Sequence, residues 1–259
     1  MDFNKIDGKP GLYLVCFAVL SLMIFCANFY FYSFLVRIIH WLGDGFSFYL
    51  YSFPIYFISS IVVLSVSYVV FSRTLWGASR LSLGIVARYL VAYSVFVVLI
   101  FILTRYPVSM ASGFLTQSLE GYTEELSVSR TRFVHFVTGV VLLIFGCLFA
   151  PFFFRISFIF PSAIVHRSVN ILSAFSRSRG MGRSMALAIG AYAVPYWLIF
   201  KLLPAVSGSL ADLLTIDAFD WAFGVAEATF AAALILYSLR VIAQAFNSTT
   251  IGVLDETWD

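Results

Sequence analysis

The chain has few charged residues, and this scarcity argues against a soluble globular domain. Of its 259 residues, 11% are charged and 61% are hydrophobic. A soluble domain normally carries about 25% charged residues, because its surface must face water. The charges cluster in short intervals, with long apolar stretches between them. A helix needs about 20 apolar residues to cross a hydrocarbon core roughly 30 Å thick, so these stretches have the length of membrane spans.

The sequence also lacks the patterns that would indicate a catalytic or metal site. Its three cysteines, Cys16, Cys26 and Cys147, lie apart within apolar stretches, so we interpret them as small buried hydrophobic residues. There is no Gly-x-Ser-x-Gly elbow, no His-Glu-x-x-His pair and no phosphate-binding loop. We therefore expect no enzyme activity, no catalytic or cofactor-binding residue, no cofactor and no metal. The net charge of +3 comes from dispersed bases and predicts no nucleic-acid partner.

The apolar runs predict helices, because they show none of the alternation that a membrane-spanning strand requires. Residues 95–103 read VFVVLIFIL without a polar interruption. Most of the 29 phenylalanines lie inside such runs, where packing between helices and against lipid is favoured over an aromatic ligand cage. The predicted fold is all-α: an integral membrane helical bundle of about six transmembrane helices plus a short interfacial amphipathic helix.

The predicted spans form a single transmembrane domain over residues 1–259. They cover about 12–35, 48–71, 85–105, 133–154, 185–206 and 223–246. The fourth apolar run continues past its span to Val165, interrupted only by Pro151, Arg155 and Pro161. As one helix this run would be about 50 Å long. It must therefore tilt strongly, bend at a proline, or extend beyond the bilayer.

An interfacial cytoplasmic helix is predicted at about 168–179, with Ser168 as its N-cap. Val169, Leu172 and Phe175 recur at helical spacing and predict its apolar face. Its basic side would face anionic lipid headgroups. The arginines expected to contact those headgroups are Arg155, Arg167, Arg177, Arg179 and Arg183.

The exit from the fourth span carries a recognisable pattern. It reads Arg-x-Ser-x-x-x-Pro-x-x-x-Val, followed by Ala-x-x-x-Ser, and the matching residues are Arg155, Ser157, Pro161, Val165, Ala174 and Ser178. This arrangement resembles bacterial six-span inner-membrane proteins of the YciC-like family and the membrane domain that accompanies some glycerophosphodiester phosphodiesterases. His166 departs from the pattern, because an acidic residue commonly sits near this position. The resemblance implies a bacterial inner-membrane location but no phosphodiesterase activity, since the hydrolase domain is absent.

Orientation follows from the distribution of Lys and Arg, because cytoplasmic loops retain positive charge. Most of the 16 Lys and Arg residues fall on the side that holds the N-terminus. With six spans, this places both termini in the cytoplasm.

Two ionisable residues inside predicted spans are hypotheses for an intramembrane polar site, Glu227 and Lys201. Glu227 would relay protons or bind a cation; alternatively, it is wetted at the outer interface or pairs with Lys201 or Arg37. Lys201 alternatively extends to the outer headgroups. Small residues at Gly224, Ala228 and Ala231–Ala233 predict a close contact of the sixth span with the fifth.

Three functional classes are compatible with these features. The favoured one is a non-catalytic scaffold or accessory subunit that binds membrane lipids or another membrane protein. The alternative is a small transporter or channel that uses Glu227, and an enzyme acting on lipid has the least support.

Overall fold

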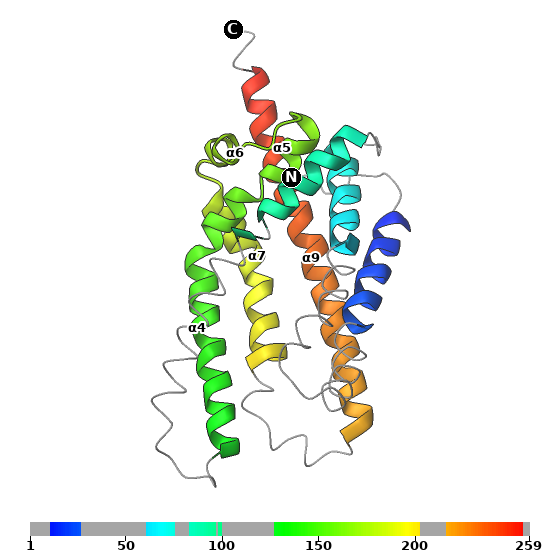
Figure 1. Cartoon of the computed structure of the whole chain (residues 1–259), viewed down its shortest axis with the longest axis vertical. Coiled ribbons are helices and arrows are strands. Elements are labelled where there is room, and N and C mark those ends of the chain that lie inside the picture. The colour runs from blue at the N-terminus through cyan, green and yellow to red at the C-terminus, as the bar shows by residue number, and fades with distance from the viewer. Residues whose placement is uncertain are drawn as a thin grey trace, which may run out of the picture. The chain divides into compact units, whose positions relative to one another are not determined.

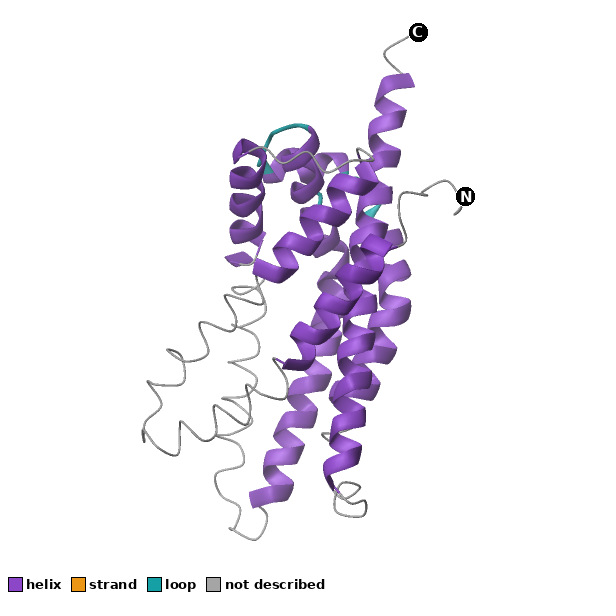
Figure 2. Cartoon of the chain, turned by 90° about the vertical axis from the view of Figure 1, so that its right-hand side faces the viewer, coloured by secondary structure: helices purple, strands orange, loops and turns teal. Residues whose placement is uncertain are grey.

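The computed structural model describes residues 11–26, 61–75, 83–96, 98–99, 127–202 and 216–255. All regular structure in these ranges is helical, with no strand among them (Figures 1 and 2). The chain divides into two compact units. The first contains Met1–Arg80 and Asp217–Arg240, and the second contains Leu81–Ile216 and Val241–Asp259.

In the first unit, the helices Gly11–Cys26 and Ile61–Leu75 pack with the N-terminal part of α9 (Ile216–Asp255). Their shared core consists of Cys16, Leu20, Val66, Val70 and Ala232. Small side chains such as Ala232 let helix backbones approach closely. Ala232 on the small-residue face of α9 therefore packs against helices of the first and second predicted spans, and the predicted contact with the fifth span stays a prediction.

The second unit contains the fourth apolar run and the segments that follow it as far as Ile216. Its elements are the helix Leu83–Phe96, α4 (Ser127–Ile156), α5 (Ile159–Val165), α6 (Ile171–Arg177), α7 (Gly182–Trp197), the π-helix η3 (Leu198–Leu202) and the end of α9. α7 packs mainly along α4. Pro195 lies inside α7 just before η3.

Among the described residues, three helical stretches are long and apolar enough to cross a membrane: Gly139–Val165, Gly182–Phe200 and Ala222–Thr249. They overlap the predicted fourth, fifth and sixth spans, and the first of them continues past its predicted end to Val165. The first three predicted spans contain the shorter apolar helices Gly11–Cys26, Ile61–Leu75 and Leu83–Phe96. The rest of those three spans lies mostly outside the described residues, so the count of six stays a prediction.

The run after the fourth span breaks before its second proline. α4 ends at Ile156, two residues form a turn, and α5 begins at Ile159. Pro161 thus occupies the first turn of a new helix, where the missing N–H has no intrahelical partner to lose. A break in the helix was not among the three expected solutions, and it falls at Ser157–Phe158, between the two prolines.

The predicted interfacial helix is shorter than expected. α6 covers only Ile171–Arg177 of the predicted 168–179, and Asn170 caps it in place of Ser168. Leu172, on its predicted apolar face, is 81% exposed, whereas Ala174 and Ser178 are buried. The small side chains of Ala174 and Ser178 allow the close approach of α6 to α4.

Candidate functional site

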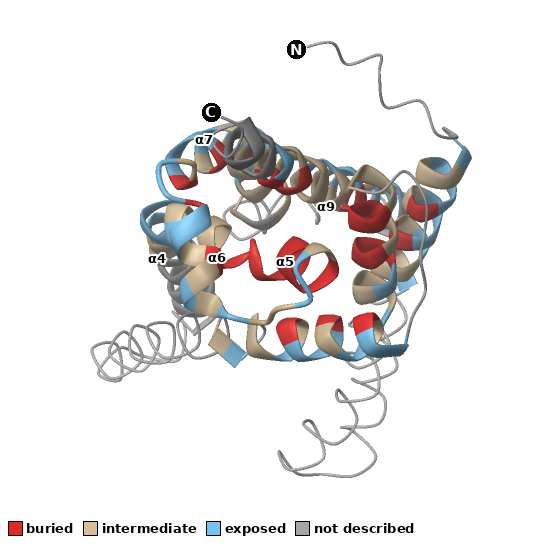
Figure 3. Ribbon diagram, turned by 90° about the horizontal axis from the view of Figure 1, so that it is seen from above, coloured by how far each residue is buried: buried red, intermediate tan, exposed pale blue. Residues whose placement is uncertain are grey.

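The described part of the second unit folds back on itself between Arg155 and Gly182. α5 is buried from Ile159 to Ile164 (Figure 3, red). Phe160 packs against the rings of Tyr89 and Phe96 at centroid distances of 5.5 and 5.0 Å. Phe158 meets Phe246 edge-on at 5.6 Å. These aromatic contacts fix α5 as the core around which the basic segment is arranged.

The chain reverses direction between α5 and α6. Arg167 adopts a left-handed conformation with φ of 53°. Asn170 then caps α6, its side chain accepting from the N–H of Leu172 at 2.9 Å and of Ser173 at 3.3 Å. Such caps satisfy donors that have no intrahelical partner. The reversal brings α6 back against the end of α4.

We expect Asn170→Ala to loosen α6, because it removes the acceptor for two backbone donors. The expected loss of helix stability is about 1 kcal/mol. Amide hydrogen exchange over 171–177 would accelerate about fivefold, as that energy implies for local opening. Asn170→Asp retains the acceptor and serves as the control; unchanged exchange in the Ala variant would contradict the capping role.

Arg155 connects α4 to α6. Its Nη2 donates to the backbone oxygen of Phe175 at 2.7 Å, and its Cζ lies 3.5 Å from the centre of the Phe175 ring. Ser178 donates to the backbone oxygen of Ala174 at 2.9 Å and approaches that of Arg155 at 3.4 Å. A guanidinium carries five N–H donors. The Nε of Arg155 is buried and has no partner among the described residues.

The close contact between the start of α7 and the end of α4 depends on Gly182. A Cβ on this residue would lie 2.6 Å from the backbone oxygen of Pro151 and 2.9 Å from Cγ of Arg155. The preceding Gly180 has φ of 83°, a conformation that side chains disfavour. Because Gly182 has no side chain, the start of α7 packs closely against Pro151 and Arg155 of α4.

The five predicted headgroup arginines divide into two kinds. Arg155 is half-buried, whereas Arg167, Arg177, Arg179 and Arg183 are exposed. The whole segment 127–202 contains no Asp or Glu. Within that segment, the charge of these arginines is therefore not neutralised by any acidic side chain.

His166 lies within this basic segment. Its ring contacts Phe246 at 5.7 Å, although the residue as a whole is exposed. Desolvation lowers the pKa of His166 below its ordinary 6.5, and the positive charge of Arg177 lowers it further. The imidazole is consequently favoured in its neutral form.

The depressed pKa of His166 predicts a pH dependence. Below pH 6.5 the unfolded chain binds a proton that the folded chain resists, so folding stability decreases as the pH falls through that value toward the lower native pKa. His166→Gln would remove the contribution of His166 to the pH dependence of the free energy of unfolding, measured between pH 7.5 and 5. Arg177→Gln should raise the pKa of His166 in an NMR titration, and a pKa that does not rise would contradict the electrostatic cause.

Of the predicted intramembrane polar residues, Glu227 and Lys201, the structure describes the side chain of Glu227 alone. Glu227 lies on α9 with 9% of its surface exposed, on the same buried face as Gly224 and Ala228. Lys201 belongs to η3, but its side chain lies outside the described residues, as does Arg37. Pairing of Glu227 with either base therefore stays a prediction.

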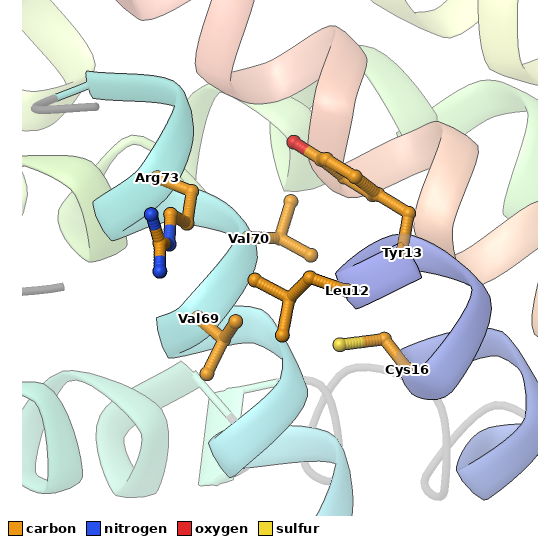
Figure 4. Close-up of a pocket in the computed structure, with 6 residues that line it drawn as sticks. All are labelled: Leu12, Tyr13, Cys16, Val69, Val70 and Arg73. Carbon is orange, nitrogen blue, oxygen red and sulfur yellow. The ribbon is translucent and has the colours of Figure 1, made fainter. Parts of the chain in front are cut away.

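A crevice in the first unit runs between Gly11–Cys26 and Ile61–Leu75. It is lined by Leu12, Tyr13, Cys16, Val69, Val70 and Arg73 (Figure 4). The crevice has no room for a water molecule. The Tyr13 hydroxyl lies 3.4 Å from Oγ1 of Thr74 near the same helix ends. This crevice is a packed helix contact, and Glu227 does not line it.

Sequence reasoning missed the buried α5 and the role of Gly182. The described residues hold no group of three or more His, Cys, Asp or Glu side chains that would bind a metal. Taken together, the fold and the acid-free basic segment define a helical membrane protein. Comparison of the chain with known protein families, curated proteins and solved structures found no match. The resemblance drawn from residues 155–178 therefore stays a prediction.

Proposed function

We propose that this protein is a non-catalytic, multi-pass protein of the bacterial inner membrane that binds anionic lipid at its cytoplasmic face. In this role it is a scaffold or accessory subunit for another membrane protein. One observation carries the proposal: an acid-free segment presents four exposed arginines in a chain whose described residues include three membrane-capable helices. Clustered basic residues at the cytoplasmic end of a span attract anionic lipid at about 1 kcal/mol each.

The positive-inside rule supports the orientation. The loop between α4 and α7 contains Arg167, Arg177 and Arg179, and short loops with such an excess stay in the cytoplasm. With both termini on the same side, the segment faces the anionic inner leaflet.

Lipid enrichment tests the proposal. The full chain is reconstituted in vesicles of phosphatidylcholine and phosphatidylglycerol, extracted with its surrounding lipid, and the lipid composition is measured. We expect phosphatidylglycerol to exceed its bulk fraction around the protein, and this excess to disappear when Arg167, Arg177, Arg179 and Arg183 are all replaced by Gln. Replacing Arg130 and Arg132, which the predicted topology places outside, is the control. Equal composition around both variants and the unmodified chain would overturn the proposal.

The burial of Glu227 supports a second candidate, a small transporter or channel. An ionisable side chain inside a membrane helix is costly and therefore often functional. Solute or proton flux in proteoliposomes that is lost in Glu227→Gln would support transport. Flux that is absent, or that survives the replacement, would leave the lipid-binding scaffold as the proposed function.

A further inference from the structure

A groove runs along the outside of α4 toward α6. It is lined by Leu148, Phe149, Pro151, Phe152, Arg155 and Phe175. The α4 residues follow helical spacing, so they form one face of the helix. Phe175 crosses from α6 and meets Phe152 at a centroid distance of 5.5 Å. The groove is thus apolar and aromatic along its length, with one cation at its end.

The size of the groove indicates which class of molecule it can bind. Its volume is about 420 Å³, within the roughly 300–1,000 Å³ of small-molecule sites. A helix with side chains is about 10 Å wide and would not enter it. From Leu148 to Arg155 the helix rises about 10 Å, so a slender chain can lie along it. A free phosphate would gain nothing from the apolar walls.

Arg155 supplies the charge complementarity. Its described contacts are a backbone oxygen and an aromatic ring, both of them neutral. No carboxylate occurs in 127–202, and the buried Nε has no described partner. A charge removed from water is costly unless an opposite charge and hydrogen bonds compensate it. A phosphate group supplies both, because arginine and phosphate form charge-assisted hydrogen bonds.

We propose that this groove binds one anionic phospholipid, with its phosphate at Arg155 and an acyl chain against Leu148, Phe149 and Phe152. The inference rests on the proposed function and narrows it to a single stoichiometric site. Exposed Arg177 follows Phe175 along the chain and favours an anionic headgroup over a zwitterionic one. Leu148 is 71% exposed, so the acyl chain enters sideways from the bilayer.

Native mass spectrometry of the full chain, released from nanodiscs of phosphatidylcholine and phosphatidylglycerol, tests the site. We expect one phosphatidylglycerol to remain bound at collision energies that strip other lipids. Arg155→Gln should lower its retention relative to phosphatidylcholine about tenfold, the effect of losing one charged hydrogen bond. Arg179→Gln makes the same charge change away from the groove and should retain the lipid.

A second pair of variants tests the groove without altering Arg155. Leu148→Trp fills it from the exposed wall and should abolish retention of the bound lipid. Leu187→Trp places the same bulk on α7, at a residue that is 76% exposed, and should have no effect. Retention that survives Leu148→Trp would overturn the site.

The outcomes separate this site from the proposed function. If phosphatidylglycerol is enriched around the protein but no single lipid is retained, the groove proposal fails and the lipid-binding scaffold stands. If Arg155→Gln and Arg179→Gln weaken retention equally, the attraction is diffuse and the groove proposal fails in the same way. If neither enrichment nor retention occurs, both proposals fail.

Discussion

Phe160→Ala is expected to lower the free energy of unfolding by about 3 kcal/mol or more. Phe160 is only 7% exposed, and its ring packs among those of Tyr89, Tyr93 and Phe96. Removing the ring leaves a cavity that a short helix held on several sides cannot close. Lipid does not drive burial as water does, but the lost dispersion contacts and the cavity cost remain. Denaturant-induced unfolding in mild detergent micelles measures the loss.

Phe230→Ala is the matched control. Phe230 lies on α9 with 49% of its surface exposed, so the same truncation leaves no closed cavity. Its expected cost is about 0.5 kcal/mol. Equal losses in the two variants would show that α5 is not the core of its unit.

Gly182→Ala is expected to destabilise the protein by about 1–3 kcal/mol, the usual cost of overpacking. The added methyl group would lie 2.6 Å from a backbone oxygen, that of Pro151, which moves only if α4 or α7 moves with it. The displacement also reaches Arg155, whose Cγ lies 2.9 Å from the new atom. Thermal unfolding gives the stability change, and hydrogen exchange over 171–177 reports the loosening of α6.

Gly190→Ala separates this clash from the ordinary effect of removing a glycine. A Cβ at Gly190 meets nothing within 4 Å, and the residue lies in the same helix. Alanine favours a helix over glycine by about 1 kcal/mol, so this variant should be slightly stabilised. Stabilisation of Gly182→Ala to the same degree would contradict the close approach of α7 to α4.

Several features of the fold could be predicted because they depend on composition alone. Apolar runs with sparse charge specify helices in lipid, since every backbone polar group must be satisfied within its own segment. The runs around Leu148, Leu187 and Ala232 accordingly appear as helices that can cross a membrane. Composition alone could not predict which helices pack against one another. The small face of α9 around Ala232 fits several helices equally well in sequence, and only packing selected Cys16, Leu20, Val66 and Val70.

The candidate site was predicted as a set of residues but not as a geometry. Basic residues at 155, 167, 177, 179 and 183 are visible in the sequence, and so is the absence of acids around them. The apolar periodicity of 169, 172 and 175 predicted an apolar face for α6, but it gave no indication that Ala174 and Ser178 would be buried. The backbone oxygen of Phe175, which accepts from Arg155, carries no sequence signal, because every residue has such an oxygen.

The sequence by itself determined that this chain is helical and suited to lipid, and that its basic residues gather after the fourth apolar run. These properties depend on hydrophobicity and charge, which act over whole segments. Tertiary structure alone decided that the run breaks at Ser157–Phe158, that α5 becomes a core, and that Arg155 lies at the end of an apolar groove. Those outcomes depend on contacts of a few ångströms between residues distant in sequence, such as Pro151 and Gly182.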